Sequence, residues 1–274
     1  MTKTFDVMEL ADILREAAKI EILPRFRHLD PKTIHTKSSA TDLVTEADTE
    51  SERRIKIEIA KRWPQAVVVG EESVAADPAL IHRVAGEELA ITVDPVDGTA
   101  NFAAGLPLFA VMASVVVRGE VIAGIIYDPL GDDWVMAERG AGAFMRRPDG
   151  SAQRLKAAGP ATVEETIAHV SIGFLPKDSK ARVLGNLGKL AISANYRCAG
   201  HDYRTMASGH CHALLFNKLM PWDHLPGTLI CAEAGAHVAR FDGSPYRAEH
   251  LAGGLLLAPD KESWSLLRRE IFTV

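Results

Sequence analysis

Two aspartates three residues apart, Asp94 and Asp97, end an apolar run and lead into a Gly98-Thr99 turn. Carboxylate and carbonyl oxygens are the ligands that hard cations such as Mg²⁺ prefer. Backbone amides at the start of a helix bind anions such as phosphate. The segment 93–102 therefore predicts that a metal ion and a phosphate group meet at one turn. From this segment alone an ordinary turn stays an open alternative, because Asp, Pro and Gly each favour turns.

Three further segments carry acidic residues in positions from which they could join this turn. Lys37 is followed by acids up to Asp48, and an apolar strand at 67–70 ends in the adjacent pair Glu71 and Glu72. Asp223 stands near the start of an apolar helix, where helix capping is the alternative interpretation. Two unit charges about 4 Å apart repel by about 4 kcal/mol at an effective dielectric near 20. If these carboxylates converge, bound cations are the expected reason.

The four segments, in this order, resemble the inositol monophosphatase family of Mg²⁺-dependent, lithium-sensitive phosphatases. The matching motifs are a lysine followed by Asp-x-Val-Thr-x-x-Asp at 37–48, Gly-Glu-Glu-Ser at 70–73, Asp-Pro-x-Asp-Gly-Thr-x-Asn-Phe at 94–102, and Trp-Asp followed by Glu-Ala-Gly within 222–235. The resemblance implies an α+β fold, a layered α-β-α-β-α sandwich of the inositol monophosphatase and fructose-1,6-bisphosphatase type. It also implies assembly as a homodimer.

The resemblance assigns metal ligands residue by residue. Glu71, Asp94 and the carbonyl of Val96 match the first metal site of the family, and Asp94, Asp97 and Asp223 match the second. Asp94 would bridge the two sites, and Glu71 would also reach a weaker third ion. The implied cofactor is Mg²⁺, with two or three ions in each active site.

The same resemblance assigns the catalytic residues as Asp48, Glu71 and Thr99. Thr99 and Asp48 would orient or deprotonate the attacking water, while Asp97, Gly98 and Thr99 would contact the phosphate. The implied reaction is hydrolysis of a small phosphate monoester by a metal-activated water. Uncatalysed hydrolysis of such esters is very slow, so stabilisation of charge by cations must lower the barrier greatly.

The substrate pocket is where the chain departs from the family pattern. The segment 201–204 carries large polar residues where small ones are usual, and Phe216 stands where an acid usually holds ring hydroxyls. Asp202 could hold a cationic amine such as that of histidinol phosphate, and Arg204 could hold a second phosphate. Pairing of these two residues with each other, or across a dimer interface, is the alternative. Inositol 1-phosphate is thus the family default, with histidinol phosphate and fructose 1,6-bisphosphate or another sugar phosphate as alternatives.

Composition limits the class of protein. The chain has 274 residues, 47% of them hydrophobic and 24% charged, as expected for a globular protein with a sizeable core. Its net charge of −5 argues against a nucleic-acid partner, since proteins that bind nucleic acids normally carry a basic face. The sequence contains no signal peptide or uninterrupted apolar span, so a cytoplasmic protein without membrane contact is expected. A different class of function stays open, since some relatives of this family act as protein-interaction modules in the transcription machinery. If this chain is such a module, its phosphatase activity would be vestigial.

Hydrophobic periodicity divides the chain into two halves near a polar turn at 146–151. Residues 1–150 are expected to form an α+β half with most metal ligands, and residues 151–274 an α/β half with Asp223 and the substrate pocket. A helix expected over 45–62 has Thr49 and Glu52 at the spacing of a capping box. The remaining expected elements are a helix near 10–18, strands at 66–69, 89–93, 110–118, 121–127, 166–170, 194–198, 213–216, 237–241 and 254–258, and helices at 179–190, 202–208, 226–234 and 261–271.

Overall fold

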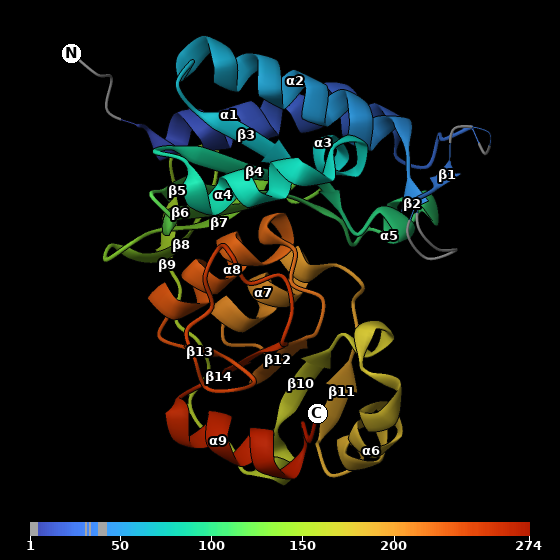
Figure 1. The fold of residues 1–274 in the computed structure, drawn as a ribbon, viewed down its shortest axis with the longest axis vertical. Coiled ribbons are helices and arrows are strands. Elements are labelled where there is room, and N and C mark those ends of the chain that lie inside the picture. The colour runs from blue at the N-terminus through green and yellow to red at the C-terminus, as the bar shows by residue number, and fades with distance from the viewer. Residues whose placement is uncertain (1–4, 31, 33, 38–42) are drawn as a thin grey trace.

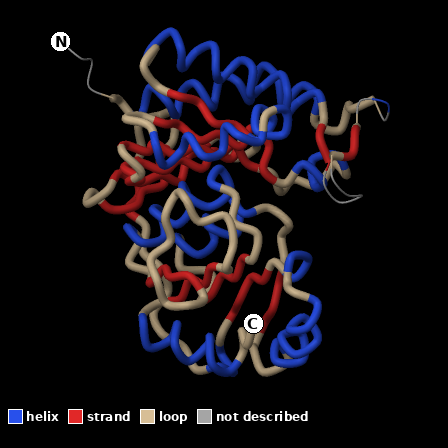
Figure 2. The backbone as a smooth tube through the Cα atoms, viewed as in Figure 1, coloured by secondary structure: helices blue, strands red, loops and turns tan. Residues whose placement is uncertain are grey.

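Five layers alternate along the long axis of the molecule (Figure 1). The structure, a computed structural model, describes residues 5–30, 32, 34–37 and 43–274, so Asp42 of the 37–48 motif lies outside the described residues. Two helices cover a seven-stranded sheet, two more lie between this sheet and a five-stranded one, and a last pair covers the far face (Figure 2). The predicted α-β-α-β-α sandwich is confirmed.

The first sheet is built almost entirely from antiparallel hairpins. Its strand order follows the chain from β3 to β9, and only the β3–β4 pair is parallel. The outer layer consists of α1 (Val7–Ala17) and α2 (Glu46–Arg62), and the strands are β3 (Val67–Gly70), β4 (Ala90–Asp97), β5 (Ala110–Val117), β6 (Glu120–Asp128), β7 (Asp133–Glu138), β8 (Gly142–Arg146) and β9 (Ala152–Arg154). A short ladder pairs β1 (His35–Thr36) with β2 (Leu43–Val44).

The second sheet has three parallel strands and two antiparallel ones. Its order is β11-β10-β12-β14-β13, with β10, β11 and β12 parallel. The strands are β10 (Ile167–Val170), β11 (Ile192–Ala194), β12 (Ala213–Phe216), β13 (His237–Arg240) and β14 (Leu255–Ala258), and the helices are α6 (Lys177–Leu187), α7 (Ala199–Ala207), α8 (Pro221–Glu233) and α9 (Lys261–Glu270). No helix in the described part of the chain combines the length and apolar character that a membrane crossing requires.

Two expected boundaries are wrong. The polar turn at 146–151, expected to separate residues 1–150 from 151–274, joins β8 to β9 within one sheet, so the chain leaves the first sheet only after Arg154. The strand expected at 194–198 ends at Ala194, and the residues that follow form a loop. A strand ends where its neighbour no longer pairs with it. Hydrophobic periodicity does not show that point, so it could not predict where β11 ends.

Alternation of side chains along the strands distributes the core between the layers. Along β5, Val111 and Ala113 pack toward α1 and α2, whereas Ala110 and Met112 pack toward α7 and α8. The same alternation in β12 places Leu214 and Phe216 toward the middle helices, with Ala213 and Leu215 toward α6 and α9. Both sheets are covered on both faces, which explains their nearly continuous apolar sequences.

One buried acid of α2, Glu52, contacts the start of α3 (Glu71–Ala76). The capping box of α2 is formed by Thr45 and Asp48, so the expected Thr49–Glu52 box is wrong. Glu52 instead accepts hydrogen bonds from the backbone amides of Glu72 at 2.7 Å and Ser73 at 3.0 Å. Because these amides belong to the first turn of α3, Glu52 fixes the orientation of that turn.

Helix α8 lies against β6 and α7 at two glycines. A Cβ added at Gly124 would lie 2.5 Å from the carbonyl oxygen of Pro226, and one added at Gly227 would lie 2.1 Å from the Tyr203 ring. Both distances are too short for any larger side chain. The absence of side chains at these positions therefore lets α8 enter the space between the two sheets.

Candidate metal and phosphate site

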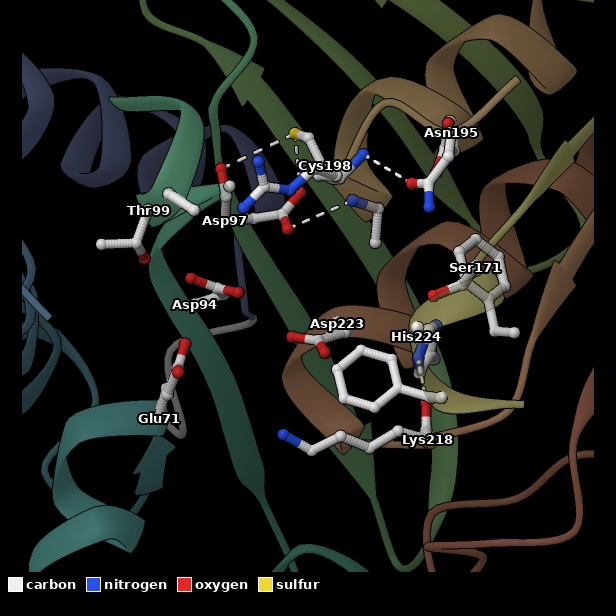
Figure 3. A pocket seen from close by; sticks show the side chains of 18 of the residues that line it. Glu71, Asp94, Asp97, Thr99, Ser171, Asn195, Cys198, Lys218, Asp223 and His224 are labelled. Carbon is white, nitrogen blue, oxygen red and sulfur yellow. Dashed lines mark hydrogen bonds between the residues drawn. The ribbon is translucent and has the colours of Figure 1, made fainter. Parts of the chain in front are cut away.

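Three carboxylates from distant parts of the sequence meet beside the end of β4 (Figure 3). Glu71 is the first residue of α3, Asp94 lies in β4, and Asp223 lies in the first turn of α8; one oxygen of each lies within 4.8 Å of the others. Burial, together with the neighbouring carboxylates, raises the pKa of Asp94 well above its usual range and that of Asp223 to about 8. An all-oxygen donor set with this repulsion fits a hard divalent cation.

Asp97 lies in the same pocket, and its carboxylate is held by the start of α7. It accepts hydrogen bonds from the amides of Ala199 at 3.1 Å and Gly200 at 2.5 Å, and from the Cys198 thiol at 3.0 Å. Burial raises the pKa of Asp97, while these three hydrogen bonds oppose the rise. Both Asp97 oxygens are thus held by the start of α7, and Asp97 is not part of the cluster that Glu71, Asp94 and Asp223 form among the described residues. Sequence reasoning overlooked Cys198, because nothing in its spacing indicates a contact with Asp97.

Thr99 connects the turn after β4 to α2. Gly98, with φ of 86°, adopts the left-handed conformation that starts α5 (Thr99–Ala103). The Thr99 hydroxyl lies 3.0 Å from Asp48 Oδ1 and 2.9 Å from the carbonyl oxygen of Val96. Burial raises the pKa of Asp48 to about 6. The expected catalytic pair Thr99 and Asp48 is therefore in hydrogen-bond contact, and the Val96 carbonyl faces it.

Lys37 supplies a positive charge at the edge of the carboxylates. Its ammonium donates to Glu71 Oε1 at 2.9 Å and to Glu72 Oε1 at 2.6 Å. Burial lowers the pKa of Lys37, but the two glutamates outweigh this effect and raise it overall. Burial raises the pKa of Glu72 to about 7. Lys37 is thus the counter-charge of Glu71 and Glu72 when no cation is bound.

The carboxylates form one side of a cavity of about 360 Å³. We call Glu71, Asp94, Asp97 and Asp223 the carboxylate wall. We call the lining residues from three loops of the second half of the chain the opposite wall; these are Ser171, Ile172, Gly173, Phe174, Asn195, Arg197 and Lys218. They come from the loops after β10, β11 and β12. Sequence reasoning did not identify Phe174, Arg197 or Lys218 as pocket residues, because the ends of parallel strands converge only once the sheet order is known.

The two substrate residues expected in α7 have different positions. Asp202 lines the pocket, but its carboxylate is 2.8 Å from His169 Nδ1 and the residue is only 5% exposed. Arg204 is not a lining residue, because its position in α7 turns it toward the first sheet. There it donates to Asp133 Oδ1 at 2.5 Å and to the Ile126 carbonyl at 3.4 Å. The expectation that Arg204 binds substrate is therefore wrong, and Asp202 and Arg204 do not pair with each other.

Two uncharged rings, those of Phe216 and His224, line the pocket together with Asp223. Phe216 lines the cavity as expected and packs 4.7 Å from the His224 ring. His224 Nε2 lies 2.8 Å from the Lys218 carbonyl, so it carries the proton, and Nδ1 accepts from the Tyr203 hydroxyl at 2.9 Å. Burial lowers the pKa of His224 to about 4. The ring next to Asp223 is consequently neutral.

The layered fold and the cluster of carboxylate oxygens define an α+β protein with a candidate metal site. The family model of the inositol monophosphatase family matches residues 6–271. The chain belongs to the inositol monophosphatase family. The motifs that carried the resemblance all lie within the matched range.

Relatives with three different names are similar in sequence to this protein over about three quarters of its length. An enzyme of Thermotoga maritima named fructose-1,6-bisphosphatase/inositol-1-monophosphatase is 30% identical over 222 residues, 78% of each chain. The inositol-1-monophosphatase of Mesorhizobium japonicum is 32% identical and covers 74% of this chain and 73% of its own length. The Nus factor SuhB of Salmonella typhimurium is 30% identical, with 76% and 75% covered. The crystal structure of SuhB from Bartonella henselae superposes with a TM-score of 0.80 at 25% identity, covering 97% of both chains.

Proposed function

We propose that this protein hydrolyses small phosphate monoesters with Mg²⁺ as cofactor. The observation that carries the proposal is the convergence of Glu71, Asp94 and Asp223, with ligand oxygens within 4.8 Å of one another. Asp94 and Asp223 have raised pKa values beside a third carboxylate, and a bound cation would compensate the negative charge that these groups carry when ionised. The family membership supports Mg²⁺, with two or three ions, as the resident metal.

The residues of the carboxylate wall would hold the ions. Glu71, Asp94 and the Val96 carbonyl would bind one, and Asp94, Asp97 and Asp223 another. When bound, such ions neutralise phosphate oxygens and increase the acidity of a nearby water. The turn at Gly98 and Thr99 would bind the phosphate through its backbone amides and the Thr99 hydroxyl.

The Thr99–Asp48 pair would move the proton. Water adds its oxygen to phosphorus as the bond from phosphorus to the alcohol oxygen breaks. One water proton passes to Thr99 Oγ1 while the Thr99 proton passes to Asp48, and the departing alkoxide takes a proton from solvent to leave as the alcohol. A carboxylate with a pKa of about 6 is suited to this role near neutral pH. No covalent intermediate with a side chain is required.

The test is phosphate release from a panel of monoesters at equal concentration, with Mg²⁺ and with EDTA. Release that depends on Mg²⁺ supports the proposal, and its absence from every ester contradicts it. Inositol 1-phosphate is the default substrate, while histidinol phosphate and fructose 1,6-bisphosphate complete the panel. LiCl is expected to inhibit relative to NaCl at matched ionic strength, because Li⁺ can take the place of Mg²⁺ among carboxylate oxygens.

A second candidate function is that of a protein-interaction module in the transcription machinery. It is favoured by the similarity to the Nus factor SuhB of Salmonella typhimurium over 212 residues. The test is binding of the purified protein, as a homodimer if it forms one, to a purified bacterial transcription elongation complex by interferometry. Binding retained in a variant without phosphate release supports this function, and no binding at micromolar concentrations contradicts it.

A further inference from the structure

Strand β9 is the edge of the first sheet, and its outer side pairs with no described strand (Figure 1). All three of its residues are exposed. The Leu155 amide donates to the Ala143 carbonyl at 2.8 Å. Because bonded positions alternate along an antiparallel pair, the amides and carbonyls of Ala152 and Arg154 point away from β8. No described residue forms a hydrogen bond with these groups, so this edge has the donors and acceptors that a further strand requires.

One face of β8 and β9 has no covering layer. Ala143 and Met145 of β8 pack toward α7 and α8, so Phe144 and Arg146 face the other side. On that side, the core beneath α1 and α2 includes Trp134 of β7 but no described residue of β8 or β9. The Phe144 ring is half-buried, and the Arg146 guanidinium lies 5.5 Å from its centre. The sheet face beside the unpaired edge is thus open to solvent.

Three cationic side chains lie on this open face. Arg146 comes from β8, and Arg154 of β9 is on the same face because it lies opposite Phe144 in the ladder. Leu155 packs toward α7 and α8, so the next residue, Lys156, is exposed on the side of Arg154. We call β9 together with Arg146 and Lys156 the basic edge.

The three cations of the basic edge form no ion pair with any described residue. On the neighbouring β7–β8 turn, by contrast, Arg139 pairs with Glu120 at 3.3 Å. Residues 142–156 contain four basic residues and one acidic residue, although the whole chain carries a net charge of −5. Like charges that lie directly opposite each other destabilise a pair of strands, so a second copy of this edge is a poor partner. A strand with acidic side chains is the partner that these charges favour.

We propose that the basic edge binds an extended acidic segment of another protein, which joins the first sheet as a strand beside β9. The backbone of the segment would form hydrogen bonds with the outward groups of Ala152 and Arg154. Its acidic side chains would contact Arg146, Arg154 and Lys156. Phosphates of a nucleic acid also attract arginines, but they cannot satisfy both the amides and the carbonyls of a strand edge, which favours a peptide. This inference goes beyond both proposed functions, because it requires neither the cavity nor its ions.

The first experiment measures binding of fluorescein-labelled peptides by fluorescence anisotropy. The acidic probe has the sequence Glu-Thr-Glu-Thr-Glu-Thr, and the control Gln-Thr-Gln-Thr-Gln-Thr keeps its length and its β-branched residues without the charge. The proposal predicts a Kd at least about tenfold lower for the acidic probe, as expected for a charged hydrogen bond. Equal Kd values for the two peptides, or no binding of the acidic probe at about 1 mM protein, would overturn it.

The second experiment changes the charge and the backbone of the basic edge separately. Arg154→Glu should weaken binding of the acidic probe about tenfold or more. Arg53→Glu is the matched control, because the Arg53 side chain is 57% exposed on α2, away from β9. Ala152→Pro removes an outward amide without changing any charge, and it should also weaken binding, whereas Ala152→Ser should not.

Circular dichroism checks that each variant keeps its fold. If Ala152→Pro does not fold, N-methylation of alternate residues of the acidic probe removes the same hydrogen bonds from the peptide side. Binding that depends on Arg154 but withstands both backbone changes would show that the charges act without strand pairing, which contradicts the proposal.

A labelled single-stranded oligouridylate tests the other class of polyanion. At an ionic strength of about 0.15 M, the acidic probe should bind more tightly than the oligouridylate, because only the peptide can pair with the strand edge. Tighter binding of the oligouridylate that is lost in Arg154→Glu and retained in Ala152→Pro would overturn the proposal and make the basic edge a nucleic-acid site. These assays involve no hydrolysis, so their failure leaves the proposed phosphatase function intact, and an inactive cavity leaves this inference intact.

Discussion

The two walls of the cavity are built in opposite ways. On the carboxylate wall, Asp97 is held by three hydrogen bonds from the start of α7, and Asp94 is only 2% exposed near the end of β4. On the opposite wall, Phe174 is 57% exposed, and the Lys218 ammonium lies 5.5 Å from the centre of its ring. Groups that perform chemistry gain from fixed geometry, because reorganisation during the reaction adds to the barrier. The opposite wall has loops that can differ between relatives without disturbing that geometry.

The largest effect is expected from Asp94→Asn, which removes a charge from the fixed wall. We expect kcat/KM to fall by about a thousandfold or more, several kcal/mol of transition-state stabilisation, because Asp94 would contact two ions. Circular dichroism should show a retained fold. Asp149→Asn, in the exposed β8–β9 turn, is the control. A variant that keeps a tenth of wild-type turnover would refute the bridging role.

Asp48→Asn tests the proton acceptor on the same wall. We expect a loss of about a hundredfold in kcat/KM, in the range for general-base catalysis. In the wild type, kcat/KM should decline as pH falls through about 6, because Asp48 must be ionised to accept a proton. A pH series on both proteins measures this. If the acidic limb persists unchanged in Asp48→Asn, another group is responsible for it.

Arg204→Ala distinguishes structural from substrate-binding cations. The Arg204 and Asp133 side chains are each 11% exposed, so the variant leaves a nearly buried aspartate without its partner. We expect the free energy of unfolding to fall by about 3 kcal/mol, measured in urea, with the preference between esters unchanged. Unchanged stability together with an altered preference between esters would show instead that Arg204 contacts the substrate.

The smallest effect is a pH dependence of stability in the metal-free protein. Asp48, Glu72 and Asp223 have pKa values raised to about 6, 7 and 8, so the folded state retains protons that the unfolded chain has lost. Their stabilising contribution is complete below about pH 4 and is lost as pH rises toward 8. We expect Tm with EDTA to fall by about 3 °C or more between pH 5.5 and 8. Mg²⁺ should offset this fall, because it binds the deprotonated carboxylates. A Tm that rises equally with and without Mg²⁺ would contradict the repulsion.

The walls also differ in what the sequence could predict. Asp94, Asp97, Gly98 and Thr99 lie within six residues, so their local spacing shows where they sit relative to one another. Alternating and apolar runs predicted individual strands and helices, because burial on one or both faces dictates those patterns, whereas the order of the layers was predicted from the family resemblance. The opposite wall joins three loops spread over residues 171–218, without a motif that marks them, and the direction of Arg204 depends on how α7 is rotated against the first sheet. Such rotation is decided by tertiary packing, for example by the contact of Tyr203 with Gly227.

The position of α8 between the sheets makes metal affinity a property of the whole molecule. Asp223 reaches Glu71 and Asp94 only when the layer that carries α8 is docked against β6. By mass action, ligand that binds only the docked arrangement stabilises it in proportion to the logarithm of ligand concentration. A substitution such as Gly124→Ala, at the contact with Pro226, would therefore act at a distance as an apparent loss of cation affinity. Conversely, cations bound by these three residues would stabilise the docking of α8 against the first sheet.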